Sequence, residues 1–262
     1  MATESATARS FDIGSVLSNT FAVIGHNFIT FAVIAAIAGI PGFAFSWLTT
    51  GMTPFGRAQF VAPPGMPPTT YVVILFAGGL LGFVFSCVPQ AALIHGTVAD
   101  LNGRRASFAD CVATGLKAFL PLAAIAILAG MGMGIGMILL VVPGIILMAA
   151  WSVAIPVRVI ERKPIFEVFG RSWQLTSGYR WPILGLFIIV GIGSAVLQFA
   201  LLPLQGIMAS STVGGSVVFL AAATIVGILV SMFGATMAGV MYYELRSAKE
   251  GIGPEALAAV FD

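Results

Sequence analysis

Four long stretches of the chain contain no charged side chain and are dominated by apolar residues. They run from 13 to 56, 58 to 99, 118 to 157 and 181 to 243. A helix needs about 20 apolar residues to cross the roughly 30 Å of hydrocarbon in a bilayer. The first two stretches therefore predict one membrane span each, near 28–48 and 71–94.

The last two stretches are long enough for two spans each, provided that the chain turns inside them. Pro143-Gly144 predicts a tight turn in the third stretch, with spans near 118–141 and 144–160. A cluster of proline, glycine and serine between 202 and 216 breaks the fourth stretch into spans near 181–202 and 217–243. The pattern predicts an all-α, polytopic membrane protein with six transmembrane helices.

Composition excludes the soluble classes of protein. Hydrophobic residues make up 59% of the chain and charged residues only 8%, whereas soluble domains carry about 25% charged residues. A net charge of +2 gives no reason to expect nucleic acid as a partner. Length and composition together favour a single integral membrane domain over residues 1–262.

The basic residues fall almost entirely on one side of the six-span topology. Eleven of the twelve lie in the terminal segments or in the loops 95–117 and 158–180, and only Arg57 lies on the opposite side. Cytoplasmic segments are enriched in lysine and arginine. We therefore expect a bacterial cytoplasmic (inner) membrane protein with both termini in the cytoplasm. A five-span topology would move the basic residues of 158–180 outside. The segment beside Arg9 lacks the apolar run of a cleavable signal.

Short amphipathic helices are predicted before each pair of spans, near 11–27, 107–117 and 164–178. In the third, Ile165, Val168, Phe169 and Trp173 lie on one side of the helix, and a Glu167–Arg171 pair is expected on the other. Such helices suit the headgroup layer, with the apolar side toward the hydrocarbon. The chain would then consist of three units, each an interfacial helix followed by a hairpin of two spans. The alternative is that these are ordinary segments beside the spans.

The segment 151–181 carries the most specific string in the sequence. It contains Trp151, Pro156-Val157, Glu161, Arg171-Ser172-Trp173, Leu175-Thr176, Gly178 and Trp181. This string, with the opening Phe11-Asp12-Ile13-Gly14, resembles the bacterial six-span glycerophosphoryl diester phosphodiesterase membrane-domain family. The resemblance implies a stand-alone membrane module without the phosphodiesterase domain, from an uncharacterised family. It implies no catalytic residues.

Polar groups inside the predicted spans are few. No Asp, Glu, Lys or Arg lies within them, which argues against transport coupled to ions through buried charges. Gln90, Gln198 and Gln205 are the strongest polar groups near the spans, and hydrogen bonding between helices is the expected role. A permease or lipid translocator would require these three side chains to converge on one cavity.

No catalytic or metal-binding set stands out, and no cofactor is expected. His26 and His95 lack the neighbouring carboxylates or thiols that a metal site needs. Cys87 and Cys111 are expected to be packing residues. We therefore expect a protein that is not an enzyme.

Glycines spaced four residues apart predict faces on which helices approach closely. Such small residues allow tight packing in membranes. They are Gly78 with Gly82, Gly130 with Gly134, and Gly132 with Gly136.

The basic loop 158–180 is the candidate site for a lipid or a protein partner. The residues that would bind are Arg158, Arg162, Lys163, Arg171, Trp173, Arg180 and Trp181. Cations near an anionic membrane contribute about 1 kcal/mol each. The alternative is that they only set the topology. The leading hypothesis is a non-enzymatic module that organises lipid or docks with another membrane protein complex, with self-association also open; the alternative is a permease or lipid translocator.

Overall fold

A computed structural model describes residues 11–51, 65–209 and 213–250. Six of its helical segments are long and apolar enough to cross a membrane, which confirms the predicted all-α, multi-pass class. These segments are Ile13–Pro41, Pro68–Leu101, Phe108–Leu139, Val141–Glu161, Arg180–Ala200 and Ala221–Glu250. Arg9 and Arg57, which enter the charge argument, lie outside the described residues.

Helix α1 (Ile13–Gly51) joins the first predicted amphipathic helix to the first span through a kink. The backbone of Asn27 leaves helical geometry there, with φ −119° and ψ 18°. The Asn27 Nδ2 donates hydrogen bonds to the backbone oxygen of Val23 (3.2 Å) and to Asp100 Oδ1 on the neighbouring helix (2.8 Å). A side chain that bonds into the helix ladder is a recognised cause of kinks.

Helix α2 (Pro68–Leu101) leads through a short loop to α3 (Phe108–Leu139). Ser107 is the N-cap of α3, because its Oγ accepts the backbone N–H of Asp110 at 3.1 Å. The predicted segment 107–117 does not form a separate helix, since α3 continues without interruption into the span. Gly115 and Pro121 lie near the boundary between the two parts, but neither interrupts the helix.

The turn between the third and fourth spans lies at Leu140, not at Pro143-Gly144 as predicted. Leu140 is extended (φ −158°, ψ 128°), and α4 (Val141–Ala150) begins directly after it. Pro143 thus falls in the first turn of α4, where the N–H that proline lacks would have no partner within the helix.

The predicted fourth span, 144–160, consists of two short helices. Helix α4 has 10 residues and α5 (Ala154–Glu161) has 8, with a turn over Trp151–Val153 between them. The N–H of Ala154 bonds the carbonyl of Trp151 at 3.1 Å in this turn. Helix α6 (Ile165–Thr176) follows as a separate element, as predicted for the third unit.

The last two spans extend beyond their predicted ends. Helix α7 (Arg180–Ala209) passes through Pro203 without ending, and α8 (Val213–Glu250) runs on past residue 243. Every described residue of the predicted break 202–216 is therefore helical.

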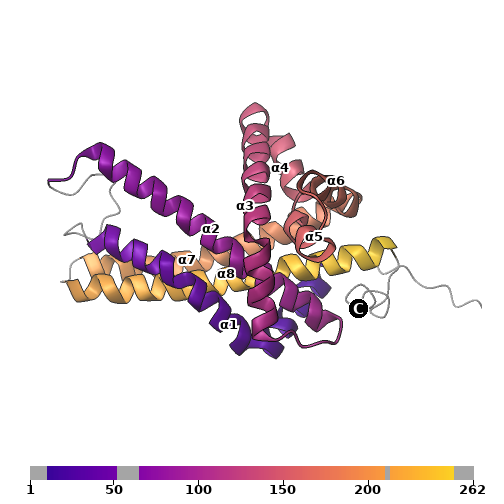
Figure 1. Ribbon diagram of the computed structural model, residues 1–262, viewed down its shortest axis with the longest axis horizontal. Coiled ribbons are helices and arrows are strands. Elements are labelled where there is room, and N and C mark those ends of the chain that lie inside the picture. Colours follow the sequence, from indigo (N-terminus) through magenta and orange to yellow (C-terminus); the bar gives the residue numbers. More distant parts are fainter. Residues whose placement is uncertain (1–10, 52–64, 210–212, 251–262) are drawn as a thin grey trace, which may run out of the picture.

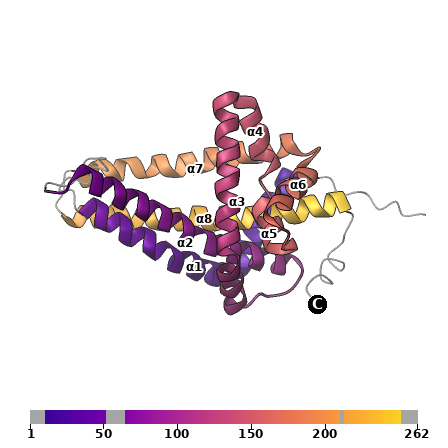
Figure 2. The same ribbon diagram turned by 45° about the horizontal axis from the view of Figure 1, so that its top comes forward.

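Helices α1, α2, α7 and α8 run alongside one another, with α8 packed against each of the other three (Figures 1 and 2). The hairpin of α3 and α4 crosses this group in both views, and α5 and α6 lie beside the hairpin and the C-terminal part of α8. The main core forms where these elements meet. Its fully buried side chains include Ile94, Leu122, Ile125, Leu175, Ile183, Leu186, Met241, Tyr242 and Leu245.

Glycines decide how closely the α3–α4 hairpin packs. A Cβ on Gly132 would lie 2.5 Å from the Trp151 ring, and one on Gly136 would lie 3.1 Å from the Cα of Gly144. Gly82, Gly130 and Gly134 have no atom within 4 Å of such a Cβ, and Gly78 is half-buried on α2. Among the glycines singled out in the sequence, only Gly132 and Gly136 therefore lie at a close helix contact that the structure describes.

Candidate functional site

The connection between α5 and α6 is a short turn held by the first basic residue of the segment. Arg162 adopts a left-handed conformation (φ 54°, ψ 24°) directly after α5. The Arg158 guanidinium donates from Nη1 to the backbone oxygens of Arg162 (3.0 Å) and Lys163. Pro164 then precedes the first residue of α6. Arg158 therefore binds the end of its own helix.

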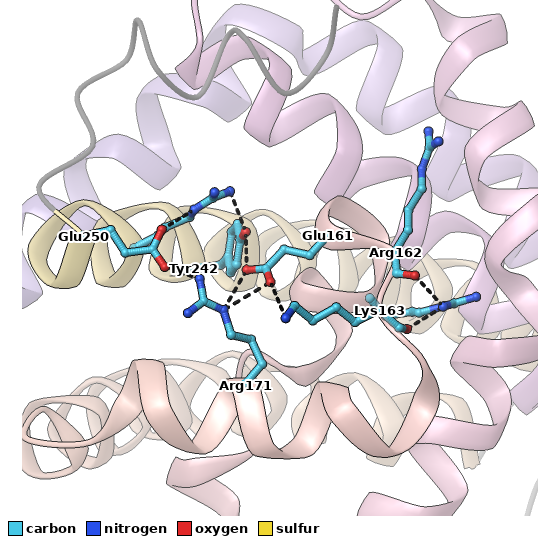
Figure 3. Close-up of polar contacts among 8 residues, drawn as sticks. Glu161, Arg162, Lys163, Arg171, Tyr242 and Glu250 are labelled. Atoms are coloured by element: carbon cyan, nitrogen blue, oxygen red, sulfur yellow. Dashed lines mark hydrogen bonds and ion pairs between the residues drawn. The ribbon is translucent and has the colours of Figure 1, made fainter.

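The Glu161 carboxylate, at the end of α5, is surrounded by donor groups of Arg171, Tyr242 and Lys163 (Figure 3). The Nε of Arg171 lies 3.1 Å from both carboxylate oxygens, and the hydroxyl of Tyr242 donates to Oε1 at 3.0 Å. The Lys163 Nζ is 3.9 Å from Oε2. Only 9% of the Glu161 side chain is exposed. A carboxylate at this depth needs such partners, because an unpaired charge there would be costly.

Arg171 extends the same network to the end of α8. It also pairs with Glu250, which accepts from Arg246 Nε at 2.8 Å, while Arg246 Nη1 donates to the hydroxyl of Tyr242 at 3.1 Å. Burial opposes the charged form of Arg171, but its hydrogen bonds and charge interactions with Glu250 and Glu161 outweigh that effect and raise its pKa. We call these five residues, Glu161, Arg171, Tyr242, Arg246 and Glu250, the ion-pair network. The predicted Glu167–Arg171 pair is wrong, because Arg171 bonds these more distant acids.

One side of α6 packs into the protein. Val168, Ser172, Leu175 and Thr176 are buried. The Ser172 Oγ donates to the backbone oxygen of Ala150 at 2.7 Å, at the end of α4. The expectation that Val168 faces the bilayer is therefore wrong, because the break after α4 offers an apolar surface and a free carbonyl that this side of α6 covers.

The Trp151 ring packs against the buried side of α6. It meets the Phe169 ring edge-on, with centroids 4.9 Å apart. It also lies against Gly132 on α3, the glycine whose Cβ would collide with it. Phe169 thus also turns toward the protein, contrary to the sequence expectation.

The opposite side presents aromatic residues to the surroundings. Phe166 is 81% exposed, Trp173 is 42% exposed and Trp181, at the start of α7, is 84% exposed. The guanidinium carbon of Arg180 lies 3.9 Å from the centroid of the Trp173 ring, a cation–π geometry. We call Phe166, Trp173, Arg180 and Trp181 the outer face. The exposed Arg162 side chain points away from the ion-pair network (Figure 3).

The basic residues singled out in the sequence are thus divided between two roles. Arg158 and Arg171 bind groups of the protein, and Lys163 lies near Glu161. Arg162 and Arg180, with the two tryptophans, are on the surface or beside it. The partners Glu250, Arg246 and Tyr242 were not predicted, because nothing in the local pattern of α8 signals a contact with α6.

Two further polar contacts tie α1 to its neighbours. The Asn19 Nδ2 donates to Glu244 Oε1 at 2.8 Å, and only 7% of Glu244 is exposed. The His26 Nδ1 lies 3.3 Å from Asp100 Oδ2, next to the bond from Asn27. The sequence does not predict these contacts either, since each joins residues far apart in the chain.

Within residues 11–51, 65–209 and 213–250, no group of three His, Cys, Asp or Glu side chains is placed to hold a metal ion. Cys87 and Cys111 are buried and free. Gln90 is half-buried on α2 and Gln198 is exposed on α7, while the side chain of Gln205 lies outside the described residues. The described glutamines do not identify a shared polar cavity.

Comparison with known proteins gives no match: no family model, no curated protein and no solved structure is significantly similar to this chain. The family resemblance of the segment 151–181 therefore stays a prediction.

Proposed function

We propose that this chain is a non-enzymatic module of the bacterial cytoplasmic membrane that organises lipid by binding phospholipid headgroups at the outer face of α6 and α7. Both termini and the α5–α6 segment lie in the cytoplasm in this proposal. The bias of eleven basic residues against one supports that orientation.

The observation that carries the proposal is the separation of the two sides of α6. The ion-pair network neutralises Arg171 within the protein, so its charge serves the fold. The outer face instead combines exposed aromatic rings with Arg180, whose guanidinium carbon lies 3.9 Å from the centroid of the Trp173 ring. Tryptophan rings favour the headgroup level of a bilayer, and arginine suits phosphate because its planar fork donates two parallel hydrogen bonds.

Native mass spectrometry of the purified full-length protein tests this proposal. The protein would be released from nanodiscs made of equal amounts of phosphatidylglycerol and phosphatidylcholine. We expect the wild type to retain phosphatidylglycerol preferentially, and the Trp173→Ala, Arg180→Gln double variant to retain several-fold less.

Arg105→Gln provides the matched control. Arg105 is an exposed arginine in the loop between α2 and α3, and it does not belong to the outer face. It should retain as much phosphatidylglycerol as the wild type. Equal retention by the double variant, with an unchanged melting temperature, would refute the proposal. A protein that stays attached through the outer face after extraction from native membranes would instead identify this surface as a docking site for another membrane complex.

A further inference from the structure

A groove opens between α1, α2 and α8, far from the α5–α6 segment. It has a volume of about 320 Å³. Its walls include Ala35 and Gly39 from α1, Gly82 and Ser86 from α2, and Gly227 and Ser231 from α8. All three helices are among the segments long and apolar enough to cross a membrane. The groove therefore belongs to the part of the protein that hydrocarbon surrounds.

The groove is closed toward the polar ends of these helices. Phe31, Leu93, Met232 and Ala235 form a buried cluster there, each at most 4% exposed. The Asn27–Asp100 hydrogen bond lies beyond this cluster. Pro89, on the groove wall, is eleven residues before Asp100, which corresponds to roughly 16 Å of helix. An occupant must therefore enter from the side or from the opposite end.

The chemistry of the walls favours an apolar occupant. None of the described lining residues is charged. The Ser86 hydroxyl already donates to the backbone oxygen of Phe83 at 2.7 Å, within its own helix, and Thr224 is also engaged in an interaction. Sites for polar ligands need several convergent polar groups, which this groove does not offer.

The width of the groove favours a thin occupant over a helix. A Cβ on Gly39 would lie 3.1 Å from the Ile228 side chain, and both residues line the groove, so α1 and α8 approach closely at its wall. A helix with its side chains is about 10–12 Å across, and a single hydrocarbon chain is much thinner. The groove is open beside two of its lining glycines, since a Cβ on Gly82 or Gly227 would meet no atom within 4 Å.

We infer that this groove binds one hydrocarbon chain of a membrane lipid, entering laterally from the bilayer. The inference goes beyond the proposed headgroup contact and does not depend on it, because the groove and the outer face share no residue. Binding here would leave the headgroup class unspecified, whereas the outer face selects anionic headgroups.

Photo-crosslinking tests this site directly. The full-length protein would be placed in vesicles of phosphatidylcholine that carries a diazirine on one acyl chain, and the adducts mapped by mass spectrometry. We expect adducts concentrated on the peptides that carry Ser86 and Ser231. Gly82→Phe and Gly227→Phe should each reduce them several-fold, because the added ring fills the open space.

Gly79→Phe is the matched control, since Gly79 lies one turn away on α2, also has open space, and does not line the groove. Its adducts should match those of the wild type. Adducts spread evenly over all exposed helix surfaces, or unchanged adducts in a folded Gly227→Phe protein, would overturn the inference. Loss of phosphatidylglycerol selectivity on changing the outer face would leave this result unaffected.

A cysteine placed in the groove gives a second test that needs no bulky substitution. Ser86→Cys, in a protein with Cys87→Ala and Cys111→Ala, should resist a charged, water-soluble thiol reagent and form no disulfide between copies. Rapid modification would indicate an aqueous path and favour the permease alternative. A disulfide between two chains would identify a second copy as the occupant. Either outcome excludes a lipid chain as the principal occupant.

Discussion

The two sides of α6 use the same residue types for opposite purposes. On the inner side, Arg171 is matched with Glu161 and Glu250, and its aromatic neighbour Phe169 packs on Trp151. On the outer side, Arg180 lies on Trp173, and Trp181 is almost fully exposed. Counting basic and aromatic residues in a loop therefore does not identify a lipid site. What separates the roles is whether an acid from a distant helix neutralises the cation.

The largest loss of stability is expected when the ion-pair network on the inner side of α6 is disrupted. Arg171→Met leaves Glu161 and Glu250 without their shared partner, and hydrogen bonds to charged groups contribute about 1.5–3 kcal/mol. We expect a loss of stability in that range, measured as a lower melting temperature in detergent. Glu167→Gln, an exposed acid on the same helix, is the control and should change stability little. Equal melting temperatures for the two variants would show that the ion-pair network does not hold α6 in place.

A glycine pair tests whether Trp151 supports the inner side by close packing. Gly132→Ala places a methyl group where only 2.5 Å separates it from the Trp151 ring, and overpacking typically costs about 1–3 kcal/mol. Gly134→Ala, two residues away with no atom within 4 Å, should be neutral or stabilising because alanine favours helix by about 1 kcal/mol. Thermal unfolding of both variants decides the point, and a stabilised Gly132→Ala protein would contradict the packing described.

A smaller loss of stability is expected when the Ser172 hydroxyl, which bonds the end of α4, is removed. Ser172→Ala removes the hydrogen bond to the backbone oxygen of Ala150, worth about 1 kcal/mol. Ser18→Ala removes an exposed bond to Ser15 and should change stability less. Chemical denaturation of the two variants measures the difference, and an indistinguishable pair would mean that the Thr176 hydroxyl, 3.3 Å from the same oxygen, satisfies the Ala150 carbonyl by itself.

Substitutions on the outer side of α6 should change the stability of the protein very little. Trp181→Ala removes a ring that is 84% exposed, and substitutions at such surface positions usually stay within about 0.5 kcal/mol. The same variant should nevertheless retain less phosphatidylglycerol. A large loss of stability in Trp181→Ala would show that the ring belongs to the core of the fold and not to a binding surface.

The sequence predicted the number of spans because charge-free runs and hydrocarbon thickness are both local properties. It could not predict the positions of the breaks. Pro143 is tolerated in the first turn of α4, so the chain turns at Leu140 instead. At the kink of α1, Asn27 bonds both its own helix and Asp100 on another helix.

The sequence also could not predict which residues of the candidate site bind groups of the protein. The seven residues singled out in 158–181 are all in one segment, but the partners that decide their roles are distant. Glu250 is 79 residues from Arg171, and Tyr242 is 81 residues from Glu161. Helical periodicity also placed Val168 toward the bilayer, whereas the break at Trp151 creates a protein surface that takes it up. Only tertiary contacts separate the two sides of α6.

The position of Trp181 relative to the bilayer shows whether the outer face contacts lipid headgroups. A protein with Trp181 as its single tryptophan, after Trp47, Trp151 and Trp173 are changed to phenylalanine, would be reconstituted with lipids brominated at different depths. We expect the strongest fluorescence quenching from bromines near the headgroup, with weak quenching by an aqueous quencher. Strong aqueous quenching without any effect of brominated lipid would contradict this expectation, because the outer face would then not contact the membrane.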